Sequence, residues 1–402
     1  MKKHLLTAAA LVAAGAGHAQ SSVTMYGVVD AGVFRQNSSA AGYSTTIPGQ
    51  STNQGSFTRY QDGGLGASNI GFKGSESLGG DFKANFQLQG NVSSATGATS
   101  ANSGAMVTGA PVGAFFNQIA VVGLSGAFGE IKIGRQVTPM YYAIASTDAR
   151  EGRYFGSILT ALVGVNSAAG WAGTTTNAPL GAIYDDNTIV YTSPKVAGFT
   201  ANLQYTLGEV AGNASAGNRQ SATLLYDANN LKLSAAYYAA RDAYTLVSNA
   251  NGTLNNRFTH LGGMYTLGNL SLDLGWSNAK NPSNQRSGLG AISVASPAAQ
   301  QLGSAAGNAN YDIVSAGAAY RIAPQYKLTA GYYRITDKNT SANKSSLLAV
   351  GLDVYLSKRS MLYVQAARVD NQGNMNQGIA YGRPVGAGIV TTGYMVGMRH
   401  AF

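Results

Sequence analysis

Short segments of alternating apolar and polar residues dominate the chain. From Phe82 to Asn91, Phe, Ala and Leu alternate with Lys, Asn and Gln. The alternation returns at 199–207 and 270–277, and more weakly at 231–241 and 326–334. A period of two residues is typical of β-strands with one apolar and one polar face. The pattern therefore predicts an all-β fold.

Tight turns rich in Gly, Asn and Pro separate consecutive strand segments. Seven such turns occur, at 78–80, 127–129, 194–198, 229–230, 268–269, 323–325 and 357–359. Seven hairpins supply fourteen strands. An opening strand at 23–34 and a closing strand at 388–402 raise the predicted number to sixteen.

Long connections rich in Gly, Ser, Asn and Ala join one hairpin to the next. They cover about 36–66, 91–116, 137–185 and 279–310. Short turns on one side and long loops on the other are typical of outer-membrane barrels, in which the turns are periplasmic and the loops extracellular. An even number of strands lets both ends of the chain meet on the periplasmic side.

The N-terminus has the features of a secretory signal. Lys2 and Lys3 precede a short apolar stretch, and small residues lead up to Ala19. We expect cleavage after Ala19, which divides the chain into a signal at 1–19 and a barrel domain at 20–402. The alternative, an anchor helix, needs about 20 apolar residues and is interrupted here by glycines.

Composition favours a membrane barrel over a soluble sheet protein. Only 11% of the 402 residues are charged, against about 25% in a typical soluble domain. The polar strand faces carry mostly Asn, Gln, Ser, Thr and Gly, which suits an aqueous lumen, and the apolar faces suit lipid. The alternative is a sandwich with an aromatic core. In hydrocarbon the sheet has to close, because an open edge leaves backbone groups unpaired.

Several motifs, in this order along the chain, resemble the general porins of beta-proteobacteria. They are Val23–Gly27, Ser68–Gly74, Val122–Gly126, Ile133–Gln136, Leu356–Arg359 and the terminal Gly397–Phe402. The resemblance implies a 16-stranded antiparallel transmembrane β-barrel, a homotrimer, and a water-filled pore narrowed by the third long loop. It also implies an outer-membrane location and passive diffusion of ions and small hydrophilic solutes.

The third long loop, about 137–184, carries the candidate constriction. It contains Asp148, Arg150, Glu151 and Arg153, followed by Phe155-Gly156. Related porins carry acids before a Phe-Gly element, facing arginines on the opposite wall. Asp148 and Glu151 fit the acidic role, while Arg150 and Arg153 give the loop mixed charge. Solvated charges on a mobile loop are the alternative interpretation.

On the opposite wall, related porins often have arginine where this chain has Asn69 and Gln118. By strand parity Lys83 and Lys132 point inward, as does Lys73 near a turn.

Arg135 matches the Gly-Arg-Gln position of the family. Strict alternation would point it outward, but a twist at the strand end can turn it toward the pore. The inward acids Asp30, Asp273 and Asp353 partly offset the lysines. We predict a weak preference for anions.

Enzyme, metal and nucleic-acid functions have little support. The chain has no cysteine, and after signal removal only His260 and His400 remain for acid–base chemistry. No metal-ligand spacing, phosphate-binding loop or cofactor motif occurs. Although the net charge is +10, the basic residues are spread singly and form no nucleic-acid patch. A substrate-selective channel, or a barrel adhesin or enzyme, remains the alternative.

The closing strand ends in an aromatic residue. Tyr394, Val396, Met398, His400 and Phe402 alternate on one face. In related porins a terminal Phe resembles the signal read by the barrel-assembly machinery, and a simple closing strand is the alternative. Lipids and lipopolysaccharide of the outer membrane are the other expected partners.

Overall fold

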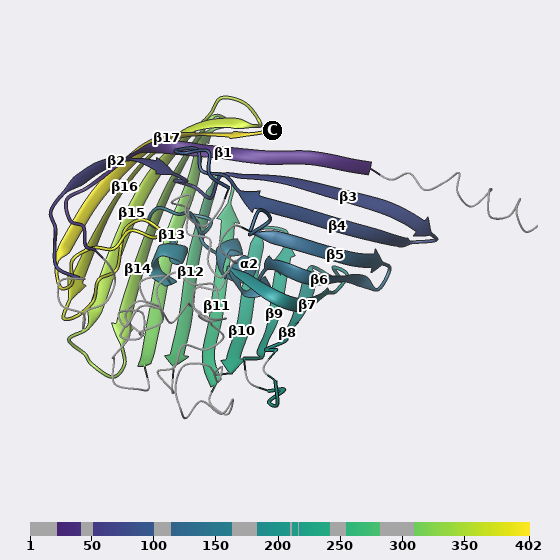
Figure 1. Ribbon diagram of the computed structural model, residues 1–402. Coiled ribbons are helices and arrows are strands. Elements are labelled where there is room, and N and C mark those ends of the chain that lie inside the picture. The colour runs from purple at the N-terminus through teal and green to yellow at the C-terminus, as the bar shows by residue number, and fades with distance from the viewer. Residues whose placement is uncertain are drawn as a thin grey trace, which may run out of the picture.

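The computed structural model describes residues 22–41, 51–99, 114–162, 183–209, 211–215, 217–241, 255–281 and 309–402. The expected signal at 1–19 lies outside these residues. All the strands described here belong to one antiparallel sheet (Figure 1). None of the described helices has the length and hydropathy needed to cross a bilayer.

Seventeen strand segments make up the sheet. Their bounds are β1 Ser22–Gln36, β2 Phe57–Asp62, β3 Asn69–Gly79, β4 Phe82–Asn91, β5 Ile119–Gly126, β6 Gly129–Val137, β7 Tyr184–Thr192, β8 Phe199–Thr206, β9 Arg219–Ala228, β10 Leu231–Arg241, β11 Asn255–Leu267, β12 Leu270–Asn281, β13 Ala309–Ala323, β14 Tyr326–Asp337, β15 Lys344–Tyr355, β16 Ser360–Gln372 and β17 Val390–Ala401.

The sheet closes on itself through β1. The second half of β1 pairs with β17, from Val28 opposite Ala401 to Gln36 opposite Gly393. β1 also pairs with β3 through its first half and with β2 through its second half. β2 and β3 therefore share one strand position, and the seventeen segments form a closed barrel of sixteen strands. This confirms the predicted barrel, although the sequence pattern had assigned β2 to a long connection.

The seven predicted turns all connect neighbouring antiparallel strands. Asn229, between β9 and β10, has φ 53°, and Gly268, between β11 and β12, has φ 59°. Two-residue hairpin turns use this left-handed region, which Gly and Asn adopt at least cost. The local turn residues thus fix the register that alternation along the strands requires.

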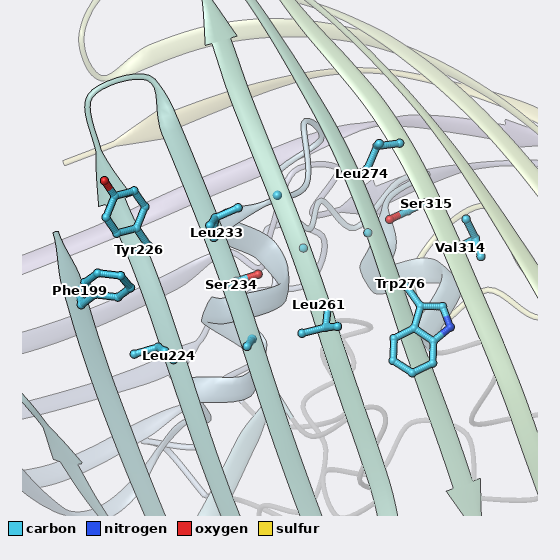
Figure 2. Close-up of a pocket in the computed structure, with 14 residues that line it drawn as sticks. Phe199, Leu224, Tyr226, Leu233, Ser234, Leu261, Leu274, Trp276, Val314 and Ser315 are labelled. Carbon is cyan, nitrogen blue, oxygen red and sulfur yellow. The ribbon is translucent and has the colours of Figure 1, made fainter.

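Outward-facing side chains form the apolar band. Figure 2 shows the outer side of β8–β13, where Leu233, Leu261, Trp276 and Val314 project from neighbouring strands. They line a groove of about 710 Å³, which Gly263 also lines. The apolar face is directed away from the lumen, as a lipid-facing surface requires.

The barrel interior holds a helix from the third long connection. Helix α2, Pro139–Ser146, is capped by Thr138, whose side chain accepts a hydrogen bond from the Tyr141 amide. Proline occupies the first helical turn, where a backbone N–H would have no partner within the helix. Figure 1 shows α2 inside the curve of the sheet. Met140, Ala143 and Ile144 are buried in a cluster that includes Tyr238 and Phe258 of the barrel wall.

Candidate functional site

The third long loop follows the inner wall of the barrel after α2. Thr147 Oγ1 lies 2.9 Å from Ser234 Oγ on β10, and the Ala149 amide donates to Asp273 Oδ1 on β12 at 2.8 Å. The Gly156 amide donates to the Ile379 carbonyl at 2.8 Å, beyond the end of β16. The predicted inward fold of this loop is therefore present over residues 138–162.

Asp148 is buried, with 4% of its surface exposed. It accepts a hydrogen bond from the Tyr333 hydroxyl on β14 at 2.6 Å and another from the Gly152 amide at 2.9 Å. The carboxylate thus closes a loop turn and attaches that turn to the wall.

Arg150 is completely buried. Its guanidinium donates to Thr329 Oγ1 at 2.9 Å and to Gln365 Oε1 at 2.7 Å, which lie on β14 and β16. Two further bonds reach the carbonyl oxygens of Phe155 and Gly156 at 3.0 and 2.5 Å. Burial lowers the pKa of Arg150 to about 10, so it stays charged at neutral pH. These hydrogen bonds compensate the guanidinium for the hydration that it loses on burial.

Arg153 forms a two-pronged ion pair with Asp353 on β15. The N–O distances are 2.8 and 2.6 Å, and the side chains are 3% and 0% exposed. Burial alone would lower the pKa of Arg153, but the hydrogen bonds and charge of Asp353 outweigh it and raise that pKa. The pair neutralises two charges at the wall.

Glu151 is the one residue of these four whose side chain is largely exposed, at 59%. It contacts Lys327 Nζ on β14 and lies 3.6 Å from Arg153. Burial opposes ionisation, yet the two cations hold the pKa of Glu151 below its usual value.

The Phe155-Gly156 element sets how closely the loop approaches the wall. Gly156 has φ 55°, and a Cβ there would collide with the Ala349 Cβ. The Phe155 ring meets Phe34 edge-on, with centroids 5.9 Å apart. Inward residues of β13–β16 such as Ile313 and Leu347 are fully buried in the same cluster. The lumen wall under the loop therefore includes a buried apolar patch beside the polar anchors of the loop, and alternation alone does not predict that patch.

The wall formed by β1 and β3–β6 carries a chain of neutral polar groups. The Tyr26 hydroxyl accepts from Gln87 Nε2 at 2.7 Å and donates to Gln89 Oε1 at 2.9 Å. Gln89 Nε2 then donates to Gln118 Oε1 at 2.5 Å. Lys73 Nζ sits 5.3 Å from the centre of the Tyr26 ring. Gln118 is thus part of an amide network, and Lys73 lies beside Tyr26 at one end of that network.

The lysines of this wall remain accessible. Lys73 and Lys132 line a hollow of about 280 Å³ together with Asn85 and Gln87. Lys132 Nζ lies 2.7 Å from Glu130 Oε2, and both side chains are about one-third exposed. Lys83, farther toward the turn of β3 and β4, is exposed.

The other two wall residues sit near the ends of their strands. Asn69 donates to the Ala67 carbonyl at 3.1 Å. Arg135 lies where the pairing of β6 and β7 shifts register between Gly134 and Gln136. Gly134 has φ 124°, and a Cβ there would collide with the Ala120 carbonyl oxygen. The shifted chain brings Arg135 to Asp186, with its guanidinium 5.4 Å from the Tyr184 ring centre.

His260 of β11 is buried against the neighbouring strand β12. It is 2% exposed, and its Nδ1 lies 2.9 Å from Ser277 Oγ. Among the residues described, no cluster of three or more His, Asp or Glu side chains could hold a metal ion.

Sequence reasoning missed the residues that complete the site. Tyr26 and Glu130 could have been found by parity, because each has the same inward parity as a lysine already identified. Thr329 and Gln365 could not, because nothing local marks them as partners of Arg150. Tyr142 is 55% exposed on α2 inside the barrel. It could have been identified only if the helix had been predicted.

Comparison with known proteins identifies related channels. Residues 6–374 match the Gram-negative porin family model. The chain is 30% identical over 409 aligned residues to outer membrane porin protein 32 of Delftia acidovorans, covering all of both chains. It is 30% identical over 231 residues to an outer membrane porin protein of Bordetella pertussis, covering 54% of this chain and 51% of the other. Its fold matches the anion-selective porin from Comamonas acidovorans with TM-score 0.71 and 25% identity, covering 95% and 100% of the two chains.

Proposed function

The chain belongs to the Gram-negative porin family, and from this premise we propose how its pore distinguishes ions. It is an outer-membrane porin for passive diffusion of ions and small hydrophilic solutes. We propose that the pore weakly prefers anions. This preference comes from Lys73, Lys83 and Lys132 on the wall of β3–β6, which we call the open wall. The solved relative named as anion-selective supports the same sign.

The observation that carries the proposal is the unequal pairing of charges in the lumen. Arg150 is buried among neutral acceptors, and Arg153 is paired with buried Asp353. Lys73, Lys83 and Lys132 stay in contact with pore water, and Glu130 pairs with only one of them. Charges near a narrow aqueous passage select ions by sign, and exposed charges act at longer range than neutralised pairs.

The four loop residues then serve the constriction in two ways. Asp148, Arg150 and Arg153 fix the loop inside the lumen, and Glu151 presents a partly compensated negative charge to the water. Across the pore, Asn69 contributes neutral polar surface, buried Gln118 extends the amide network of Gln89, and Arg135 pairs with Asp186 near the end of β6. This division keeps the passage narrow without making it strongly selective.

We also propose the assembly and partners that the family implies. The chain forms a homotrimer in the outer membrane, surrounded by lipid and lipopolysaccharide. Phe402 is the recognition terminus for the barrel-assembly machinery. Its ring packs against Gly27 at the β1–β17 seam, where a Cβ would collide with the ring. The proposal includes no catalytic step and no cofactor.

Solute flux into vesicles tests this function. Proteoliposomes containing the refolded protein should swell in sugars, with rates that fall smoothly as the sugar grows. In planar bilayers, current should rise linearly with voltage and appear in groups of three steps if trimers insert. Saturation of the current by one particular solute would instead indicate a substrate-selective channel, and correctly folded barrel without conductance would contradict the proposal.

A further inference from the structure

A basic pocket lies at the lumen rim, away from the constriction. It occupies about 210 Å³ between the β15–β16 turn and the end of β17. Lys358, Arg359 and Arg399 line it, together with Tyr355, Ser357, Ser360, Met361 and Ala401. No acidic residue is part of this lining. Short turns face the periplasm in outer-membrane barrels, so the pocket lies at the periplasmic mouth.

The pocket opens toward pore water. Met361 and Arg399 are directly opposite each other in the pairing of β16 and β17, and both alternate with outward residues such as Leu362 and Met398. Arg399 is half-buried, while Lys358 and Arg359 are exposed. The Ala401 amide donates to the Arg359 carbonyl at 2.9 Å, which fixes the turn against the last strand.

None of the described acids contacts the three cations, although Asp30 lies opposite Arg399 in the pairing of β1 and β17. Within the residues that the structure describes, none of their side chains makes an ion pair or hydrogen bond, in contrast to Arg150 and Arg153. A fourth cation adjoins them, because the Arg321 guanidinium stacks 5.3 Å from the ring centre of Tyr355. Arginine forks match the oxygens of phosphate in pairs. Several cations around one small hollow favour a multiply charged oxyanion over chloride.

We propose that this pocket is a binding subsite for soluble phosphate-bearing anions at the periplasmic mouth, a role that deepens and rests on the proposed anion-preferring pore. Bound phosphate would partly occlude the exit and make phosphate flux saturable while chloride flux stays linear. A conducting pore can hold such a site when binding is weak enough to permit release.

Bilayer recording with inorganic pyrophosphate tests the subsite. Channels are recorded in zwitterionic lipid in KCl, and pyrophosphate is added to one compartment and then the other. We expect chloride current to be reduced more strongly from one side. The half-inhibitory concentration should rise about tenfold in Arg399→Gln and in the double variant Lys358→Gln/Arg359→Gln, since each loses charge-assisted bonds.

Lys195→Gln is the matched control, because Lys195 is an exposed lysine of another short turn. It should leave the half-inhibitory concentration unchanged. Equal inhibition from both sides, or an equal loss in Lys195→Gln, would overturn the subsite. Inhibition that vanishes in bilayers containing phosphatidylglycerol would assign the pocket to lipid headgroups and overturn the soluble ligand. Chloride conductance measured before pyrophosphate is added tests folding and the proposed pore separately from the subsite. If Arg399→Gln does not fold, the double variant Lys358→Gln/Arg359→Gln still tests the subsite.

Discussion

The two sides of the lumen use charge differently. On the wall of β12–β16, Arg150 and Arg153 of the loop meet acceptors on three strands and are almost fully buried. On the wall of β3–β6, Lys73 and Lys132 line a water-accessible hollow. The loop arginines are directed to buried partners, whereas these lysines face the water of the lumen.

The difference shows that the sign of residues in a loop does not establish their contribution to selectivity. A buried charge that is paired with an opposite charge, as Arg153 is with Asp353, has little field left for a passing ion, whereas the pair contributes strongly to where the loop sits. An exposed lysine near a turn contributes little to stability but acts on the solute. Mutations on the two sides should therefore separate loop position from ion preference.

Breaking the buried ion pair should have the largest effect. Arg153→Ala leaves Asp353 buried without its partner, so we expect a loss of about 3–5 kcal/mol of unfolding free energy. Denaturant titration of the protein folded into lipid vesicles measures this loss. Channel recordings should also become noisier, because the loop is less firmly attached to β15.

The double variant Arg153→Met/Asp353→Leu is the control for that prediction. It removes both charges and retains comparable bulk, so much of the lost stability should return. If the double variant is as unstable as Arg153→Ala, the cost comes from lost packing and not from an unpaired carboxylate.

Reversing charge on the open wall should change selectivity most. In Lys83→Glu/Lys132→Glu, two cations become anions beside Glu130, and we expect the zero-current potential in a KCl gradient to shift toward the cation side. Lys83→Gln/Lys132→Gln should give an intermediate potential, which separates charge from side-chain size. An unchanged potential would contradict the assignment of these two residues to the pore wall.

Shortening the exposed tyrosine of α2 should widen the pore without changing which ion the pore prefers. Tyr142→Ala removes a ring that faces the lumen, and we expect single-channel conductance to rise by an amount on the order of tens of per cent. The zero-current potential should stay at the wild-type value. A conductance equal to that of wild type would place the narrowest section elsewhere.

Glu151 should have the smallest effect, and its effect should depend on pH. Because its folded-state pKa is lowered, its pair with Lys327 contributes above the ordinary carboxyl pKa and is lost as pH falls through the lower folded-state value. Wild type should then become slightly more anion-preferring in acid. Glu151→Gln should show that increase already at neutral pH.

The difference between the two pH series isolates this residue from other titrating carboxylates. The zero-current potentials of wild type and Glu151→Gln should differ at neutral pH and converge in acid. Parallel curves with a constant gap would show that the Glu151–Lys327 pair does not control the field at this point.

Much of the barrel could be predicted because its rules are local. Alternation specifies strand faces, and residues such as Gly268 and Asn229 specify turns, so all seven short connections followed from the sequence. The division of one strand position into β2 and β3 could not be predicted in this way. It depends on Asp30, whose carboxylate accepts from the amides of Gly64, Leu65 and Gly66, a contact between segments distant in sequence.

The candidate site was predictable in its residues but not in their partners. Parity was enough to point Lys83 and Lys132 inward, and the mixed charge of the loop was visible in its sequence. The partners Thr329, Gln365 and Asp353 lie about 180 to 215 residues away. Such distant pairings depend on barrel closure, which no local pattern encodes.

The most direct test of the account is the zero-current potential of the wild-type channel in a KCl gradient at low ionic strength, where screening is weakest. The account predicts a potential of the sign given by preferential chloride flow, which decreases as total salt rises. A potential of the opposite sign, or one independent of salt, would contradict the claim that the accessible lysines of the open wall set the selectivity of this pore.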